Sequence, residues 1–139
     1  MKAFERVQHY QLVIAARRLG YPMWILRLSI ATYRMPRVVR IGQVVSYVLR
    51  ATRGITAGSG FATTEMKPVM IPIVDKAVEQ FKQVEPTLFV DDLSVEVVGP
   101  CKSLPNIIAG FVKVVAKGIS ETEMELSATK CICNASTDA

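Results

Sequence analysis

Two adjacent carboxylates, Asp91 and Asp92, stand between the apolar arms of the segment Leu88–Val98. Ionised carboxylates are costly to desolvate, so both cannot be buried without compensation. A divalent cation would relieve their mutual repulsion, and oxygen-only ligands favour Mg²⁺ or Mn²⁺ over zinc. The simpler alternative is a solvated Asp-Asp turn that binds nothing.

The glycine-rich segment from Gly54 to Gly60 could bring the backbone close to a ligand. Glycine permits such an approach, and the amides could meet phosphate or sugar at the start of the following helix. The segment is not a P-loop, because no Lys-Ser or Lys-Thr follows its second glycine. An ordinary connecting loop is the alternative.

A basic stretch that also contains tyrosines precedes this loop. Its composition suits phosphate contact and base or sugar stacking, and its members are Arg34, Arg37, Arg40, Arg50 and Arg53 with Tyr33 and Tyr47. Residues 1–53 hold ten basic residues and one acid, whereas residues 54–139 hold seven lysines and eleven acids. This asymmetry favours a polyanion such as RNA or DNA as partner. The alternative is a solvated basic face.

Helices and strands alternate along the chain in a way that predicts an α+β fold. Apolar spacing predicts helices over residues 3–19, 22–35, 61–83 and 104–117. Gly20 is placed to end the first of these helices, and Pro68 and Pro72 must break or kink the third. β-branched runs predict a hairpin over residues 37–49 with a type II′ turn at Gly42-Gln43. Further strands are expected on both sides of Asp91 and Asp92 and over Lys130–Asn134.

Composition excludes several classes of protein. The 139 residues fit one domain, and half of them are apolar, so a buried core can form. No apolar run approaches the roughly 18–20 residues of a membrane span, and the charged start lacks a signal peptide. The odd cysteine count (Cys101, Cys131 and Cys133) fits a reduced intracellular protein of the nucleus or cytoplasm. A single histidine, His9, excludes a histidine-rich zinc site.

The order of these features resembles the palm of reverse transcriptases, particularly those of retrotransposon and group II intron type. Four segments are similar to successive palm motifs, namely Lys2–Val7, Thr52–Ser59, Phe89–Asp92 and Leu126–Lys130. The third of these, Phe-Val-Asp-Asp, looks like the Tyr-x-Asp-Asp box. Residues 18–25 resemble the helix pair that follows the first motif. The resemblance covers nearly the whole chain.

This resemblance implies roles for residues at matching positions. Asp91 would be a catalytic metal ligand, with Asp92 beside it as an auxiliary, in two-metal catalysis with Mg²⁺ or Mn²⁺. Phe4 would exclude a ribose 2′-hydroxyl, and Lys130 would lie near the leaving pyrophosphate. The residues implied to contact the incoming deoxynucleoside triphosphate or the template are Lys2, Ala3, Ala57, Gly58, Ser59 and Phe89. Arg37, Arg40, Arg50 and Arg53 would hold an RNA or DNA template-primer.

The chain also departs from the family pattern. The Asp of the first motif would lie before Met1, Ala57 stands where the family often has Gln, and Phe89 replaces the commoner Tyr. Fingers and thumb are missing. We therefore expect residues 1–139 to form a single incomplete palm-like domain, in which a small antiparallel sheet with an Asp-Asp hairpin packs on helices.

The expected function is that of a fragment of an RNA-directed DNA polymerase that is inactive as this isolated chain. It would add deoxynucleotides to a primer 3′-end only within a larger enzyme. One alternative is a basic nucleic-acid-binding module without catalysis. Another is a remnant that does not fold stably.

Overall fold

The computed structural model describes the chain except for residues 1–2, 57, 125, 128–129 and 137–139. It has a mixed α+β architecture, which confirms the α+β class expected from the sequence, but the four strands among the described residues form two separate two-stranded sheets. Its elements are α1 (Ala3–Arg6), α2 (His9–Arg18), α3 (Met23–Tyr33), β1 (Arg40–Ile41), β2 (Val44–Val45), α4 (Ala62–Gln80), β3 (Val84–Phe89), β4 (Asp92–Val97) and α5 (Leu104–Glu121). Within the described residues, no helix is both long and apolar enough to cross a membrane.

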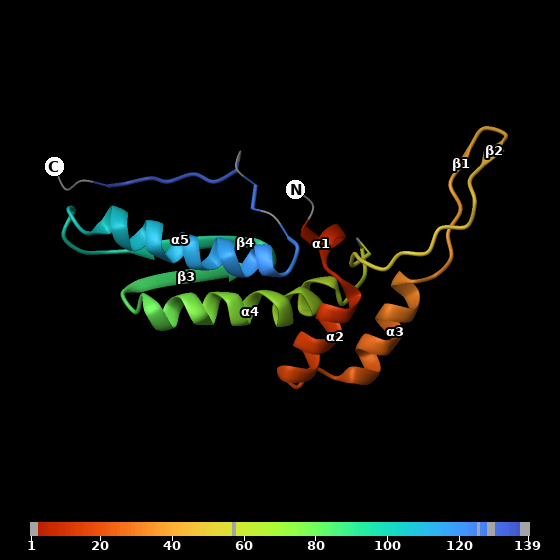
Figure 1. Ribbon diagram of the computed structural model, residues 1–139, viewed down its shortest axis with the longest axis horizontal. Helices are drawn as coiled ribbons and strands as arrows, with labels where there is room; N and C mark the ends of the chain where they lie inside the picture. Colours follow the sequence, from red (N-terminus) through yellow and green to blue (C-terminus); the bar gives the residue numbers. More distant parts are fainter. Residues whose placement is uncertain (1–2, 57, 125, 128–129, 137–139) are drawn as a thin grey trace.

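The main layer consists of α4 and α5, which pack together and are covered on one side by the hairpin β3–β4 (Figure 1). Side chains along the two strands alternate, so Val84, Leu88 and Val95 turn toward the helices. On α5, buried apolar residues recur every four positions, and Phe111 meets Phe81 edge to face with ring centroids 6.4 Å apart. The hairpin on helices that the sequence predicts is therefore present.

A second group of helices packs at the other end of α4, where α2 contacts both α3 and α4. Gly20 follows α2 with a φ of +69°, a conformation that glycine adopts without a Cβ clash, and so ends the helix as predicted. Pro22 directly precedes α3, where its fixed φ is compatible with a helix start. Leu12, Ala16 and Leu26 lie in the core that these helices share with α4.

The single helix predicted over residues 3–19 is wrong, because the chain breaks at Val7 and Gln8 between α1 and α2. The backbone there pairs with residues 53–54 instead. The amide of Gly54 donates to Val7 O at 2.8 Å, and Gln8 forms an antiparallel bridge with Arg53. Val7 is buried by this pairing, so a tertiary contact has overridden the local helical pattern.

Of the break or kink expected at Pro68 and Pro72, the break is wrong, because α4 continues through both residues. Each proline removes one helical hydrogen bond, which disfavours a helix interior. Nine residues of α4 are nonetheless buried, and this packing outweighs the local cost.

The strand predicted over Lys130–Asn134 is not formed, since residues 130–136 are exposed and have no regular structure.

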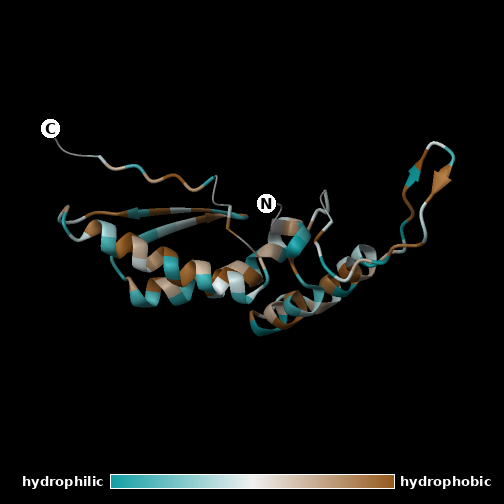
Figure 2. Ribbon diagram, turned by 45° about the horizontal axis from the view of Figure 1, so that its top comes forward, coloured by the Kyte–Doolittle hydropathy of each residue, from teal (hydrophilic) through white to brown (hydrophobic). Residues whose placement is uncertain are grey.

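The hairpin predicted over residues 37–49 forms an arm that projects beyond the end of α3 (Figures 1 and 2). Its paired strands are shorter than expected, only β1 and β2, with an isolated bridge between Arg37 and Leu49 nearer the body. Gly42 has a φ of +60° and Gln43 has no positive φ, which is the pattern of the predicted type II′ turn. We call residues 35–51 the arm.

Candidate functional site

Asp91 and Asp92 lie at the tip of the hairpin β3–β4. Phe89 pairs with Asp92, so Val90 and Asp91 form a two-residue turn. Val90 has a φ of +60°, which is strained for a β-branched residue and is normally occupied by glycine in such turns. The sequence pattern thus predicted the hairpin, but the turn lies one residue earlier than the Asp-Asp pair, and the strain at Val90 is a feature that the pattern did not reveal.

Both carboxylates are exposed to solvent, and Phe89 is 75% exposed beside them. No group of three or more His, Cys, Asp or Glu residues in the described part of the chain could hold a metal ion. Two adjacent acids on one turn cannot surround two cations, since each ion needs several oxygen ligands. The residues that the structure describes therefore do not fit the two-metal site that the resemblance implies.

The glycine-rich loop is held against the N-terminal residues. Ile55 N donates to Phe4 O at 2.7 Å, and the φ of Gly54 is +92°. A Cβ at Gly54 would lie 3.2 Å from Glu5 O, so this position needs glycine both for its conformation and for space. The structure thus brings the segments similar to the first and second palm motifs into direct contact.

A buried polar network lies beneath this loop and was not recognised from the sequence. Tyr33 Oη donates to Glu65 Oε2 at 2.6 Å and lies 3.1 Å from Ser59 Oγ. Tyr33 and Glu65 are fully buried, and burial together with the Glu65 hydrogen bond raises the pKa of Tyr33 to about 12. His9 Nε2 donates to Gly54 O at 2.9 Å, and its ring lies 6.1 Å from that of Tyr33.

This network connects the start of α2, the end of α3, the start of α4 and the glycine-rich loop. Its detectable signal was the position of Glu65, which shares the apolar face of α4 with Ala62, Met66 and Val69. A buried carboxylate needs a hydrogen-bonding partner, and that requirement could have been stated in advance. The network fixes the loop from which Ser59 and Gly58 were expected to face a nucleotide.

The arginines expected to bind nucleic acid are exposed, and most of them belong to the arm. Arg37 Nη2 donates to Thr56 Oγ1 at 3.1 Å and to Tyr33 O at 3.4 Å, so this side chain ties the arm to the loop. Arg40 Nε donates to Gly42 O at the tip, which leaves its terminal amino groups toward solvent. Arg50 is exposed on the segment that returns from the arm, and Arg53 bridges Gln8 through its backbone.

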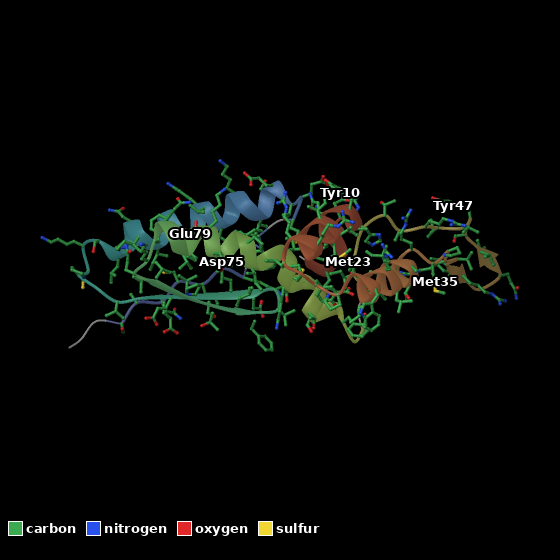
Figure 3. The ribbon with its side chains drawn as sticks, turned by 90° about the horizontal axis from the view of Figure 1, so that it is seen from below. Tyr10, Met23, Met35, Tyr47, Asp75 and Glu79 are labelled. Atoms are coloured by element: carbon green, nitrogen blue, oxygen red, sulfur yellow. The ribbon has the colours of Figure 1, made fainter. Side chains whose placement is uncertain are left out.

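Figure 3 shows the arm from a third direction, with Met35 and Tyr47 far along the molecule from Asp75 and Glu79 on α4. Tyr47 is 81% exposed, so its ring is free to stack on a base. No acidic residue occurs between Glu5 and Glu65 in the sequence, so the arm carries positive charge only.

The remaining predicted site residues are not gathered around the Asp-Asp turn. Lys130 is exposed in a turn, and its backbone amide donates to Ser127 O. The turn of β3–β4 lies toward α1 (Figures 1 and 2), yet no described hydrogen bond joins Asp91 or Asp92 to Phe4 or Ser59. Lys2 and Ala57 lie outside the described residues, and Ala3 is the first residue of α1.

Comparison with known proteins gave no match: no protein-family model fits the chain, and no curated protein or solved structure is significantly similar to it.

Proposed function

We propose that this chain binds nucleic acid through its basic arm and is a palm-like fragment of an RNA-directed DNA polymerase that does not extend a primer by itself. The observation that carries the proposal is the arm, an exposed hairpin with Arg37, Arg40 and Arg50 and no acid. Arginines contact phosphates whatever the base sequence, so binding is expected to be strongly salt-dependent and sequence-independent.

The polymerase part of the proposal has separate support. The four palm-like segments occur in the family's order, and the Asp-Asp box occupies a hairpin turn. The loop from Gly54 to Gly60 adjoins Phe4, as a nucleotide site built from the first two motifs requires. Catalysis is not expected, because the described residues offer Asp91 and Asp92 but no third metal ligand beside them.

A basic nucleic-acid-binding module without polymerase ancestry is the second candidate. The exposure of Asp91 and Asp92 to solvent favours it, since these acids are then only the solvated residues of a turn. The two candidates predict different affinities for RNA with a recessed primer end. A palm fragment should prefer a primed template over single-stranded RNA of the same length, and that preference should fall in Asp91→Ala. A simple basic module should show neither effect.

The experiment is a competition binding assay with the full chain, using primed and unprimed RNA and the Asp91→Ala variant. A preference that needs Asp91 supports the palm fragment, and equal affinities support the module. Absence of RNA binding at low salt would contradict both candidates. A parallel primer-extension assay in Mn²⁺ should give no product, and extension that Asp91→Ala abolishes would show that the chain is an active polymerase.

A further inference from the structure

The outward face of β3–β4 carries acids that repel each other. The strand register places Glu85 directly opposite Glu96, and Phe89 opposite Asp92, with all four side chains exposed. Like charges directly opposite on neighbouring strands destabilise a sheet. Within the described part of the chain, no hydrogen bond or ion pair compensates Glu85 or Glu96. We call this surface the acidic face.

The arm, in contrast to the acidic face, exposes many apolar side chains to solvent. Seven of its valine, isoleucine and tyrosine side chains are more than half exposed, namely Val38, Val39, Ile41, Val44, Val45, Tyr47 and Val48. An isolated two-stranded hairpin is at best marginally stable in water, so a covering surface would stabilise it. The register places Arg40 opposite Val45 on one face and Ile41 opposite Val44 on the other.

One chain cannot bring these two surfaces together. The arm leaves the body beyond α3, whereas β3–β4 lies over α4 and α5 with its turn toward α1, so the hairpin and the arm's tip lie apart in Figures 1, 2 and 3. Complementary surfaces at opposite ends of a molecule associate between copies, not within one.

We propose that the Arg40 and Val45 face of the arm packs on the acidic face of a second copy of this chain. Arg40 would lie near Glu85 and Glu96 and relieve their repulsion, and Val45, directly opposite Arg40, would lie against the same part of the acidic face. The contact is head to tail, so it can add further copies. This inference goes beyond the proposed function, although nucleic acid would compete for Arg40.

The test is sedimentation velocity on the full chain over a concentration series, at about 50 mM and about 500 mM salt, which screens exposed charges. The wild-type chain should associate at low salt and dissociate at high salt. Arg40→Glu should weaken association at least tenfold, and so should the double variant Glu85→Lys/Glu96→Lys. A wild-type chain that stays monomeric at low salt overturns the proposal.

Mixing the two charge-reversed variants gives the sharpest result. Each variant alone now repels itself, but the basic arm of the Glu85→Lys/Glu96→Lys chain can still meet the intact acidic face of the Arg40→Glu chain. Mixing the two variants in equal amounts should therefore restore association. Failure of the mixture to associate, with both variants folded by circular dichroism, contradicts the proposed contact.

Neighbouring valines supply the matched control, because Val45 and Val44 lie on opposite faces of the arm. Val45→Ser should weaken association, whereas Val44→Ser should leave it unchanged. Equal effects of the two variants would show that the arm associates without the proposed face. The Glu85→Lys/Glu96→Lys variant should still bind RNA, so loss of self-association is distinguishable from loss of the proposed function.

Discussion

Replacement of Tyr33 by phenylalanine removes one oxygen atom from the buried network. Tyr33 Oη is the only described donor to Glu65 Oε2, at 2.6 Å, and Glu65 Oε1 has no partner within the described residues. A hydrogen bond to a charged group contributes about 1.5–3 kcal/mol, and a buried acceptor left without a donor costs a similar amount. We therefore expect Tyr33→Phe to lower the free energy of unfolding by about 2–3 kcal/mol.

Because of the same hydroxyl, the free energy of unfolding should decrease at alkaline pH. The pKa of Tyr33 is raised from 10.0 to about 12 in the folded chain, so the folded state favours the neutral phenol. The stabilisation is complete below pH 10 and is lost as the pH rises toward 12. A shift of this size corresponds to about 2–3 kcal/mol. Wild-type stability should fall by that amount over this interval relative to Tyr33→Phe, which lacks the titrating group.

The assay is urea denaturation followed by circular dichroism, at neutral pH and between pH 10 and 12. Tyr10→Phe is the matched control, because Tyr10 is exposed and its hydroxyl accepts a hydrogen bond from Gln11 Nε2 at 3.2 Å. Its cost should stay below about 0.5 kcal/mol. The double variant Tyr33→Phe/Glu65→Met should recover most of the lost stability, since both polar partners are then replaced by apolar groups. Equal costs for Tyr33→Phe and Tyr10→Phe would refute the role assigned to the network.

Two further predictions concern the backbone. Val90→Gly should stabilise the chain by about 1 kcal/mol in urea denaturation. Glycine relieves the backbone strain at a φ of +60°, and this gain is larger than the conformational entropy that glycine loses on folding. Destabilisation by Val90→Gly would contradict this prediction. Gly54→Ala should lower stability by about 2 kcal/mol and Gly58→Ala by about 1 kcal/mol, since both have positive φ but only Gly54 faces a close backbone atom. Equal losses for the two glycine variants would show that the contact with Glu5 O is unimportant.

The sequence predicted those elements whose stability comes from their own pattern. Gly42 and the β-branched residues around it specify the arm, and the apolar residues on both sides of Asp91 specify β3–β4. The amphipathic spacing of α5 gives a helix with a buried stripe at Phe111, Val115 and Ile119. In these segments local preference and tertiary packing agree.

The failures occur where tertiary contacts override local preference. The sequence pattern places Val7 in one long helix, but in the structure its backbone pairs with Gly54, which lies more than forty residues away in the chain. Pro68 and Pro72 predict a break or a kink, but the burial of α4 keeps the helix continuous. The network of Tyr33, Glu65 and Ser59 joins three separate segments, so spacing along the chain could not reveal it.

Salt-dependent binding of single-stranded RNA tests the proposed nucleic-acid function most directly. Each phosphate contact contributes about 0.7 to the slope of log affinity against log salt, so Arg40→Ala/Arg50→Ala should reduce the slope by about 1.4. Arg17→Ala/Arg18→Ala removes the same charge from the end of α2, away from the arm, and should leave the slope nearly unchanged. A wild-type chain that does not bind at low salt, or equal slope changes in the two variants, would contradict nucleic-acid binding by the arm.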